Sequence, residues 1–79
     1  MRRDERIASH LDPTLILTKR RVQILELLGT GARGPDVAKA LGIGLDTVYE
    51  HLKVMRDRFG ARSTPELLRL AIHHGFLSP

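Results

Sequence analysis

Residues 37–59 read VAKALGIGLDTVYEHLKVMRDRF, and this stretch decides the fold. Its second part carries four apolar residues at intervals of four, three and four, namely Val48, Leu52, Met55 and Phe59. This spacing places their side chains on one face of a helix. Residues 42–44, Gly-Ile-Gly, interrupt the apolar pattern and predict a sharp turn between two helices. Two helices joined in this way are typical of a helix-turn-helix.

The bulk composition favours one small, basic domain. The chain has 79 residues, a formal net charge of +4 and no cysteine. Disulfides and thiolate metal sites are therefore excluded, which leaves a second subunit as the remaining aid to a small core. Residues 1–21 contain six basic and three acidic residues, and residues 45–62 contain four and three. This basic excess suits a polyanionic partner.

The sequence also predicts a cytoplasmic protein without membrane contact. No apolar run approaches the length of a membrane span. The N-terminus begins with charged residues, but the apolar core of a signal peptide does not follow them.

Capping signals divide the remaining chain into further helices. Thr18 is a predicted N-cap, Pro35 fits the first turn of a second helix, and residues 63–66, Ser-Thr-Pro-Glu, predict the start of a fourth. Either Gly44 or Asp46 could cap the third helix. We expect an all-α, four-helix bundle with helices at about residues 19–28, 35–41, 45–59 and 65–74. Because no stretch shows sustained alternation of period two, we expect no sheet.

The N-terminal segment, residues 1–14, is predicted to be an extension of a domain at residues 15–79. Ile7 and Leu11 lie four residues apart, which favours a short helix from Asp4 to Leu11. Such a helix is marginal in water by itself, so a disordered extension is the alternative.

The sequence carries no recognisable catalytic or metal-binding arrangement. No candidate nucleophile is paired with a histidine, and no glycine-rich phosphate loop is present. His73 and His74 are adjacent, so their side chains point to different helix faces and chelate one ion poorly. We therefore expect a protein that is not an enzyme and needs no cofactor or metal.

The polar face of the predicted helix at 45–59 suits DNA. Lys53 can donate to guanine O6 or N7, Glu50 can accept from cytosine N4, and Tyr49 can contact a phosphate or a thymine methyl. Four further residues have side chains suited to phosphates: Thr47, Arg56, Arg58 and Arg62. The structural alternative is the solvated polar face of a small helical bundle.

From Leu17 to Leu77 the chain resembles the LuxR-type helix-turn-helix domain of bacterial response regulators and quorum-sensing activators. The matching residues are Leu17-Thr18, Arg20, Leu25, Leu27-Leu28, Gly31, Val37-Ala38, Leu41-Gly42-Ile43, Thr47-Val48, His51, Gly60, Arg62, Glu66-Leu67, Ala71-Ile72 and His74-Gly75. The resemblance implies a third helix in the major groove and a homodimer formed through the fourth helix.

The resemblance also assigns roles by position. The base-facing residues it implies are Tyr49, Glu50 and Lys53. The residues it implies for the DNA backbone are Thr18, Thr47, His51, Arg56 and Arg62. The dimer face it implies includes Leu68 and Ile72.

The chain departs from the family pattern at several of these positions. Arg21 stands where the family usually has an acid, so an internal ion pair is lost or a phosphate contact is gained. Gly44 replaces the usual Ser or Thr cap, and Tyr49 and Glu50 replace the more common Lys and Val. No receiver or ligand-binding domain accompanies the motif, so we expect an excised domain or, favoured by the N-terminal extension, a stand-alone regulator.

Two functional hypotheses follow. The first is a bacterial or phage transcription regulator that binds double-stranded DNA sequence-specifically as a homodimer. The alternative is a protein-interaction module of the same fold, which acts on RNA polymerase or another regulator and contacts DNA weakly. Glu50 and the nearly neutral surface of the third helix motivate the alternative.

Overall fold

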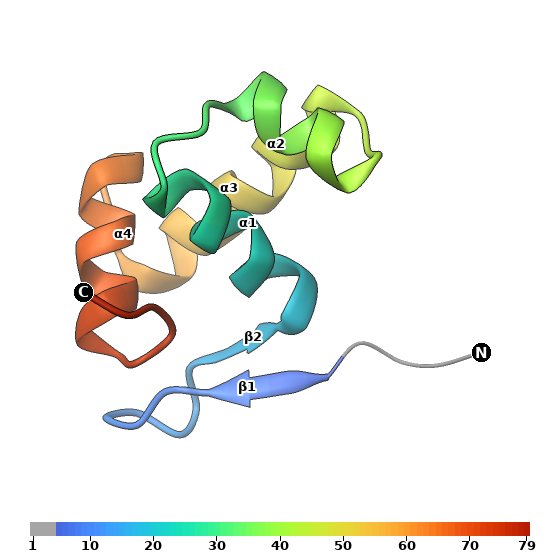
Figure 1. Ribbon diagram of the computed structural model, residues 1–79. Helices are drawn as coiled ribbons and strands as arrows, with labels where there is room; N and C mark the ends of the chain where they lie inside the picture. The colour runs from blue at the N-terminus through green and yellow to red at the C-terminus, as the bar shows by residue number, and fades with distance from the viewer. Residues whose placement is uncertain (1–4) are drawn as a thin grey trace.

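The computed structural model describes residues 5–79 as a two-stranded sheet followed by four helices. The strands are β1 (Arg6–Ala8) and β2 (Ile16–Thr18), and the helices are α1 (Lys19–Gly29), α2 (Gly34–Leu41), α3 (Leu45–Phe59) and α4 (Thr64–His73). Figure 1 shows the helices above the small sheet, with α4 at one side. The four predicted helices are confirmed, and each end lies within one residue of its expected position.

The helix boundaries follow from local capping. Thr18 Oγ1 accepts a hydrogen bond from the backbone N–H of Arg21 at 3.3 Å, and Ser63 Oγ accepts one from Glu66 at 3.2 Å. These bonds satisfy amides that have no partner within the first helical turn. Gly44, not Asp46, is the N-cap of α3, and it offers no side-chain cap. The third helix therefore starts without the hydroxyl cap that α1 and α4 have.

The expectation of no sheet is wrong, and so is the predicted helix where it covers β1. Strands β1 and β2 pair antiparallel, with Ile7 opposite Leu17. Three residues per strand are too few for a period of two to show in the sequence, and the pairing joins residues that lie 8 to 12 positions apart. Leu11, expected to share a helix face with Ile7, lies instead on the hairpin loop and is 58% exposed. Asp4, the start of the predicted helix, lies outside the described residues.

The hairpin loop is tied to the end of α4. Ser9 is 4% exposed, and its Oγ lies 2.7 Å from Nδ1 of His74. The backbone N–H of His10 donates to the carbonyl oxygen of His74 at 3.1 Å. Hydrogen bonds of Ser9 and His10 thus join the hairpin loop to the end of α4.

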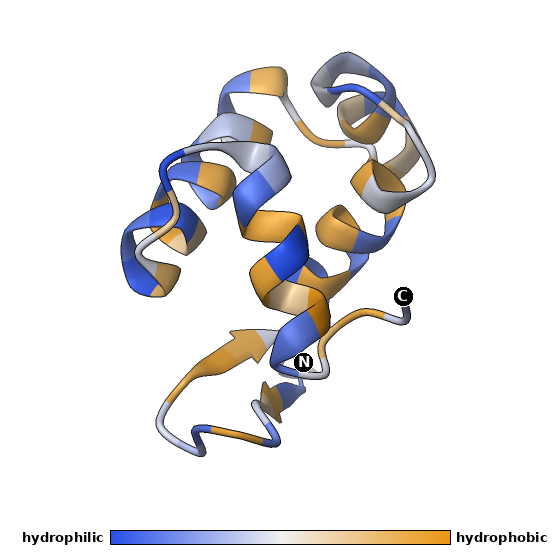
Figure 2. Ribbon diagram, turned by 90° about the vertical axis from the view of Figure 1, so that its left-hand side faces the viewer, coloured by the Kyte–Doolittle hydropathy of each residue, from blue (hydrophilic) through white to orange (hydrophobic). Residues whose placement is uncertain are grey.

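The core lies between the four helices and β2. Its fully buried large side chains are Leu17, Ile24, Leu25, Val37, Val48, Met55 and Leu67. Helix α3 packs on α2 and on α4, and α1 packs on both of them. Apolar and polar segments alternate along the helices, as expected for helices with one face in a core (Figure 2). None of the described helices has both the length and the apolar character needed to cross a membrane.

Candidate nucleic-acid interface

Helix α3 has one buried and one exposed face, as its sequence predicts. Val48, Leu52 and Met55 are buried, the first and last completely. Successive residues of a helix advance by about 100°, so residues on the opposite side of the helix from these three point away from the core. The exposed side chains include all three that were expected to face bases: Tyr49, Glu50 and Lys53. The core thus holds α3 firmly while its polar side remains open to a partner.

Tyr49 is partly braced by the start of α2. Its side chain is 51% exposed. A Cβ built on Gly34 would lie 3.0 Å from Cε1 of Tyr49 and 3.1 Å from its hydroxyl oxygen. The ring therefore lies against the Gly34 backbone, where a side chain would crowd it. The absence of a side chain at position 34 leaves room for the Tyr49 ring against the start of α2.

The five residues expected to face the DNA backbone fall into two groups. Thr18 and His51 line one shallow pocket beside α3. Thr47 and Arg62 are exposed and Arg56 is half-buried, and none of the three lines that pocket. The backbone N–H of Arg62 donates to Oε1 of Glu66 at 2.7 Å, which fixes the turn before α4.

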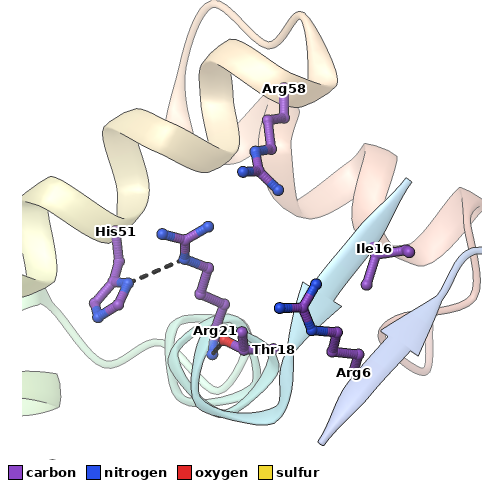
Figure 3. Close-up of a pocket in the computed structure, with 6 residues that line it drawn as sticks. All are labelled: Arg6, Ile16, Thr18, Arg21, His51 and Arg58. Atoms are coloured by element: carbon purple, nitrogen blue, oxygen red, sulfur yellow. Dashed lines mark hydrogen bonds between the residues drawn. The ribbon is translucent and has the colours of Figure 1, made fainter. Parts of the chain in front are cut away.

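Arg21 connects the first helix to the third. Its Nε–H donates to Nδ1 of His51 over 3.1 Å, as Figure 3 shows. His51 therefore accepts at Nδ1, which requires that this nitrogen carry no proton. Burial, and then the positive charge of Arg58, lower the pKa of Arg21. The arginine nevertheless stays charged at neutral pH, because its unperturbed pKa lies far above 7.

Arg6 and Arg58 complete the surroundings of Arg21. The pocket has a volume of about 250 Å³ and is lined by Arg6, Ile16, Thr18, Arg21, His51 and Arg58. Arg58 is among the residues that the sequence predicts to suit phosphates, and Arg21 departs from the family pattern, but no sequence pattern indicates a role for Arg6. Only the strand pairing of β1 with β2 brings Arg6 to this place. Arg6 could therefore not be predicted, because the hairpin that positions it was not expected.

The fourth helix exposes part of its apolar surface. Ile72 is 37% exposed and Leu68 is half-buried. Both line a groove of about 390 Å³ with residues at the end of α1 and at the C-terminus. These are the two residues expected at a dimer face. Within residues 5–79 no group of three or more His, Asp or Glu side chains is arranged to hold a metal ion.

The fold and the exposed face of α3 define the class of protein as a helix-turn-helix domain. Residues 15–71 match the family described as bacterial regulatory proteins, luxR family. This chain belongs to the luxR family of bacterial regulators.

Relatives of known role agree with this assignment. The transcriptional regulatory protein MctR of Rhizobium johnstonii is 35% identical over 74 residues, which cover 94% of this chain and 33% of MctR. The oxygen regulatory protein NreC of Staphylococcus epidermidis is 32% identical over 68 residues, or 86% of this chain and 31% of NreC. This chain thus spans about a third of the length of these relatives, which are named as regulators rather than enzymes.

Solved structures show the same architecture. The Vibrio cholera VqmA–ligand–DNA complex is similar with a TM-score of 0.73 and 38% identity, over 84% of this chain and 29% of VqmA. The phage VqmA–DPO complex gives a TM-score of 0.71 and 32% identity, over 80% of this chain and 29% of that chain. The all-α helix-turn-helix bundle expected from the sequence is therefore confirmed, with the hairpin as an addition.

Proposed function

We propose that this chain is a transcription regulator that binds double-stranded DNA sequence-specifically, with α3 in the major groove. The observation that carries the proposal is the two-faced character of α3. Its buried face is anchored by Val48 and Met55, while Tyr49, Glu50 and Lys53 stand exposed together on the other side. A recognition helix needs this arrangement, because the base edges are read by side chains that project from a helix held by its own domain.

The chemistry of the exposed face suits bases of mixed identity. Lys53 can donate to O6 and N7 of guanine, and Glu50 can accept from N4 of cytosine. Repulsion between the Glu50 carboxylate and the DNA phosphates lowers the affinity for every duplex in which Glu50 does not meet a cytosine N4 donor. Glu50 therefore raises sequence selectivity and lowers non-specific binding. In this proposal Thr18, Thr47, His51, Arg56 and Arg62 contact the DNA backbone.

Replacing Lys53 by alanine is expected to weaken binding to a preferred duplex by roughly 1–3 kcal/mol, because a base contact is lost. Replacing Arg62 is expected to weaken all duplexes alike, because phosphates carry no sequence information. Both side chains are exposed, so neither change should disturb the core. Fluorescence anisotropy with one preferred and one shuffled duplex, over a salt series, measures both effects.

The result of that series separates the two functional hypotheses. Loss of preference in Lys53→Ala supports DNA reading by α3. If the wild-type chain binds no duplex even at low salt, DNA reading is wrong. A stable complex with RNA polymerase or another regulator that survives Lys53→Glu would then support the interaction module.

We also propose that two copies of the chain pair through α4 on a target of two-fold symmetry. The half-exposed Ile72 beside Leu68 supports this, since an apolar strip on an amphipathic helix is stabilised when a second copy covers it. The expected partner surface is the same strip on the second copy.

Replacing Ile72 by glutamate is expected to prevent pairing, because two carboxylates would meet across the two-fold axis without partners. His73→Glu is the matched control, since it adds the same charge to the neighbouring exposed position, which does not line the groove. Sedimentation velocity with and without a two-fold duplex measures the mass of each variant. Equal masses for the wild-type chain and Ile72→Glu in both conditions would contradict pairing through α4.

A further inference from the structure

Three arginines from three separate elements meet around one pocket. Arg6 comes from β1, Arg21 from α1 and Arg58 from α3. Their guanidinium groups point into the same space, which also adjoins the side chains of Thr18 and His51 (Figure 3). No acidic side chain among residues 5–79 lines this space. We call these five residues the basic pocket.

The electrostatics of the basic pocket are unfavourable without an anion. Arg21 is half-buried, and the burial together with the charge of Arg58 lowers its pKa. Like charges in a partly desolvated place repel each other, and an anion at their centre would reverse the sign of that energy. The Arg21–His51 hydrogen bond occupies Nε of the guanidinium. The two terminal nitrogens of Arg21 therefore remain on the pocket side, as Figure 3 shows.

We propose that the basic pocket binds one phosphate group. Guanidinium groups match phosphate oxygens with paired N–H donors, and the Thr18 hydroxyl adds a donor at the rim. A volume of about 250 Å³ accommodates a tetrahedral oxyanion with some of its water. A phosphodiester of the DNA backbone placed there would neutralise one of the three arginine charges, and a divalent inorganic phosphate would neutralise two. The phosphate oxygens could be reached from all three elements.

The phosphate can come from two sources. One is the backbone of duplex DNA, in which case this inference rests on the proposed function. His51 links the pocket to α3, so a phosphate bound there would lie at the edge of the groove that α3 enters. The other source is free inorganic phosphate, which would bind independently of DNA. It would stabilise the folded chain by bridging β1, α1 and α3.

The test compares Arg6→Gln and Arg21→Gln with the control Arg69→Gln. Arg69 is an exposed arginine of α4 that lies outside the pocket, so its replacement removes the same charge elsewhere. The Arg6→Gln variant is expected to fold normally, because Arg6 is exposed and β1 pairs through its backbone. The test therefore remains valid even if Arg21→Gln fails to fold. Two measurements are made on the full chain, namely duplex affinity over a salt series and melting temperature in phosphate against chloride at equal ionic strength.

If the backbone is the source, both pocket variants lose affinity for every duplex by roughly threefold to tenfold, and the slope of log K against log salt falls by about one. Arg69→Gln then behaves as the wild-type chain. If free phosphate is the source, inorganic phosphate raises the melting temperature of the wild-type chain and of Arg69→Gln but not of the two pocket variants.

The proposal is overturned if neither measurement distinguishes the pocket variants from Arg69→Gln. Its failure is distinguishable from failure of the proposed function. A wild-type chain that binds no duplex refutes DNA reading, while its melting temperature in phosphate still decides whether the pocket takes the anion. A chain that reads DNA normally with a glutamine at position 6 or 21, and gains nothing from phosphate, refutes the pocket alone.

Discussion

Replacing Met55 by alanine is expected to lower the free energy of unfolding by about 2–5 kcal/mol. Met55 is fully buried on the inner face of α3, between Leu52 and Phe59 in the apolar series. Truncation removes apolar contacts and leaves a cavity that the surrounding helices fill only in part. Because domains of this kind are stable by only about 5–15 kcal/mol, the change takes a large share of the total.

Urea denaturation followed by circular dichroism measures this effect. Lys53→Ala serves as the control, because the side chain is exposed two residues away on the same helix, and its expected effect is within about 0.5 kcal/mol. Equal losses for the two variants would mean that the buried face of α3 does not anchor the domain. DNA binding by Met55→Ala should fall only with the folded fraction, since no base-facing side chain changes.

Replacing Ser9 by alanine is expected to destabilise the chain by about 1–3 kcal/mol, because several polar groups lose their partner at once. Ser9 Oγ accepts hydrogen bonds from the backbone N–H groups of Leu11 and Asp12, each at 3.0 Å. With both acceptor sites engaged, its hydroxyl hydrogen is directed to Nδ1 of His74, 2.7 Å away. One hydroxyl thus closes the hairpin loop and joins it to the end of α4.

Thr14→Ala is the matched control for Ser9→Ala. Thr14 also carries a hydroxyl in the same loop, and that hydroxyl donates to Oδ1 of Asp12 at 2.6 Å, but the residue is exposed. Water can replace an exposed partner, so its expected loss is within about 0.5 kcal/mol. Thermal unfolding of both variants at neutral pH gives the comparison. Should Ser9→Ala melt like Thr14→Ala, the hairpin would not be held through His74.

The helices could be predicted because their signals are local. Thr18 and Ser63 act on amides within three residues, and the apolar spacing of α3 from Val48 to Phe59 extends over about three turns. The sheet could not be predicted, because each strand has three residues and its stability depends on a partner beyond a loop. Asp12-Pro13 is typical of a turn, but without a recognisable strand on either side it does not by itself indicate a hairpin.

In the candidate site, too, the features set by local sequence could be predicted and those set by long-range contacts could not. The exposure of Tyr49, Glu50 and Lys53 follows from the period of one helix, so the sequence was sufficient to predict it. The basic pocket joins Arg6, Arg21 and Arg58, which are as many as 52 positions apart (58 minus 6). Only the tertiary fold brings such residues together. The arginine at position 21, where the family usually has an acid, indicated a change in this region. It did not indicate that Arg6 and Arg58 lie beside it.

The most direct test of the central claim is selection of bound sequences from a random pool of duplex DNA. The claim is that the exposed face of α3 reads DNA sequence. The expected result is an enriched motif of two-fold symmetry for the wild-type chain, and a motif that loses its preference at one base pair in each half for Lys53→Ala. Selection that enriches no motif with the folded wild-type chain, or the same motif with Lys53→Ala, would contradict the claim.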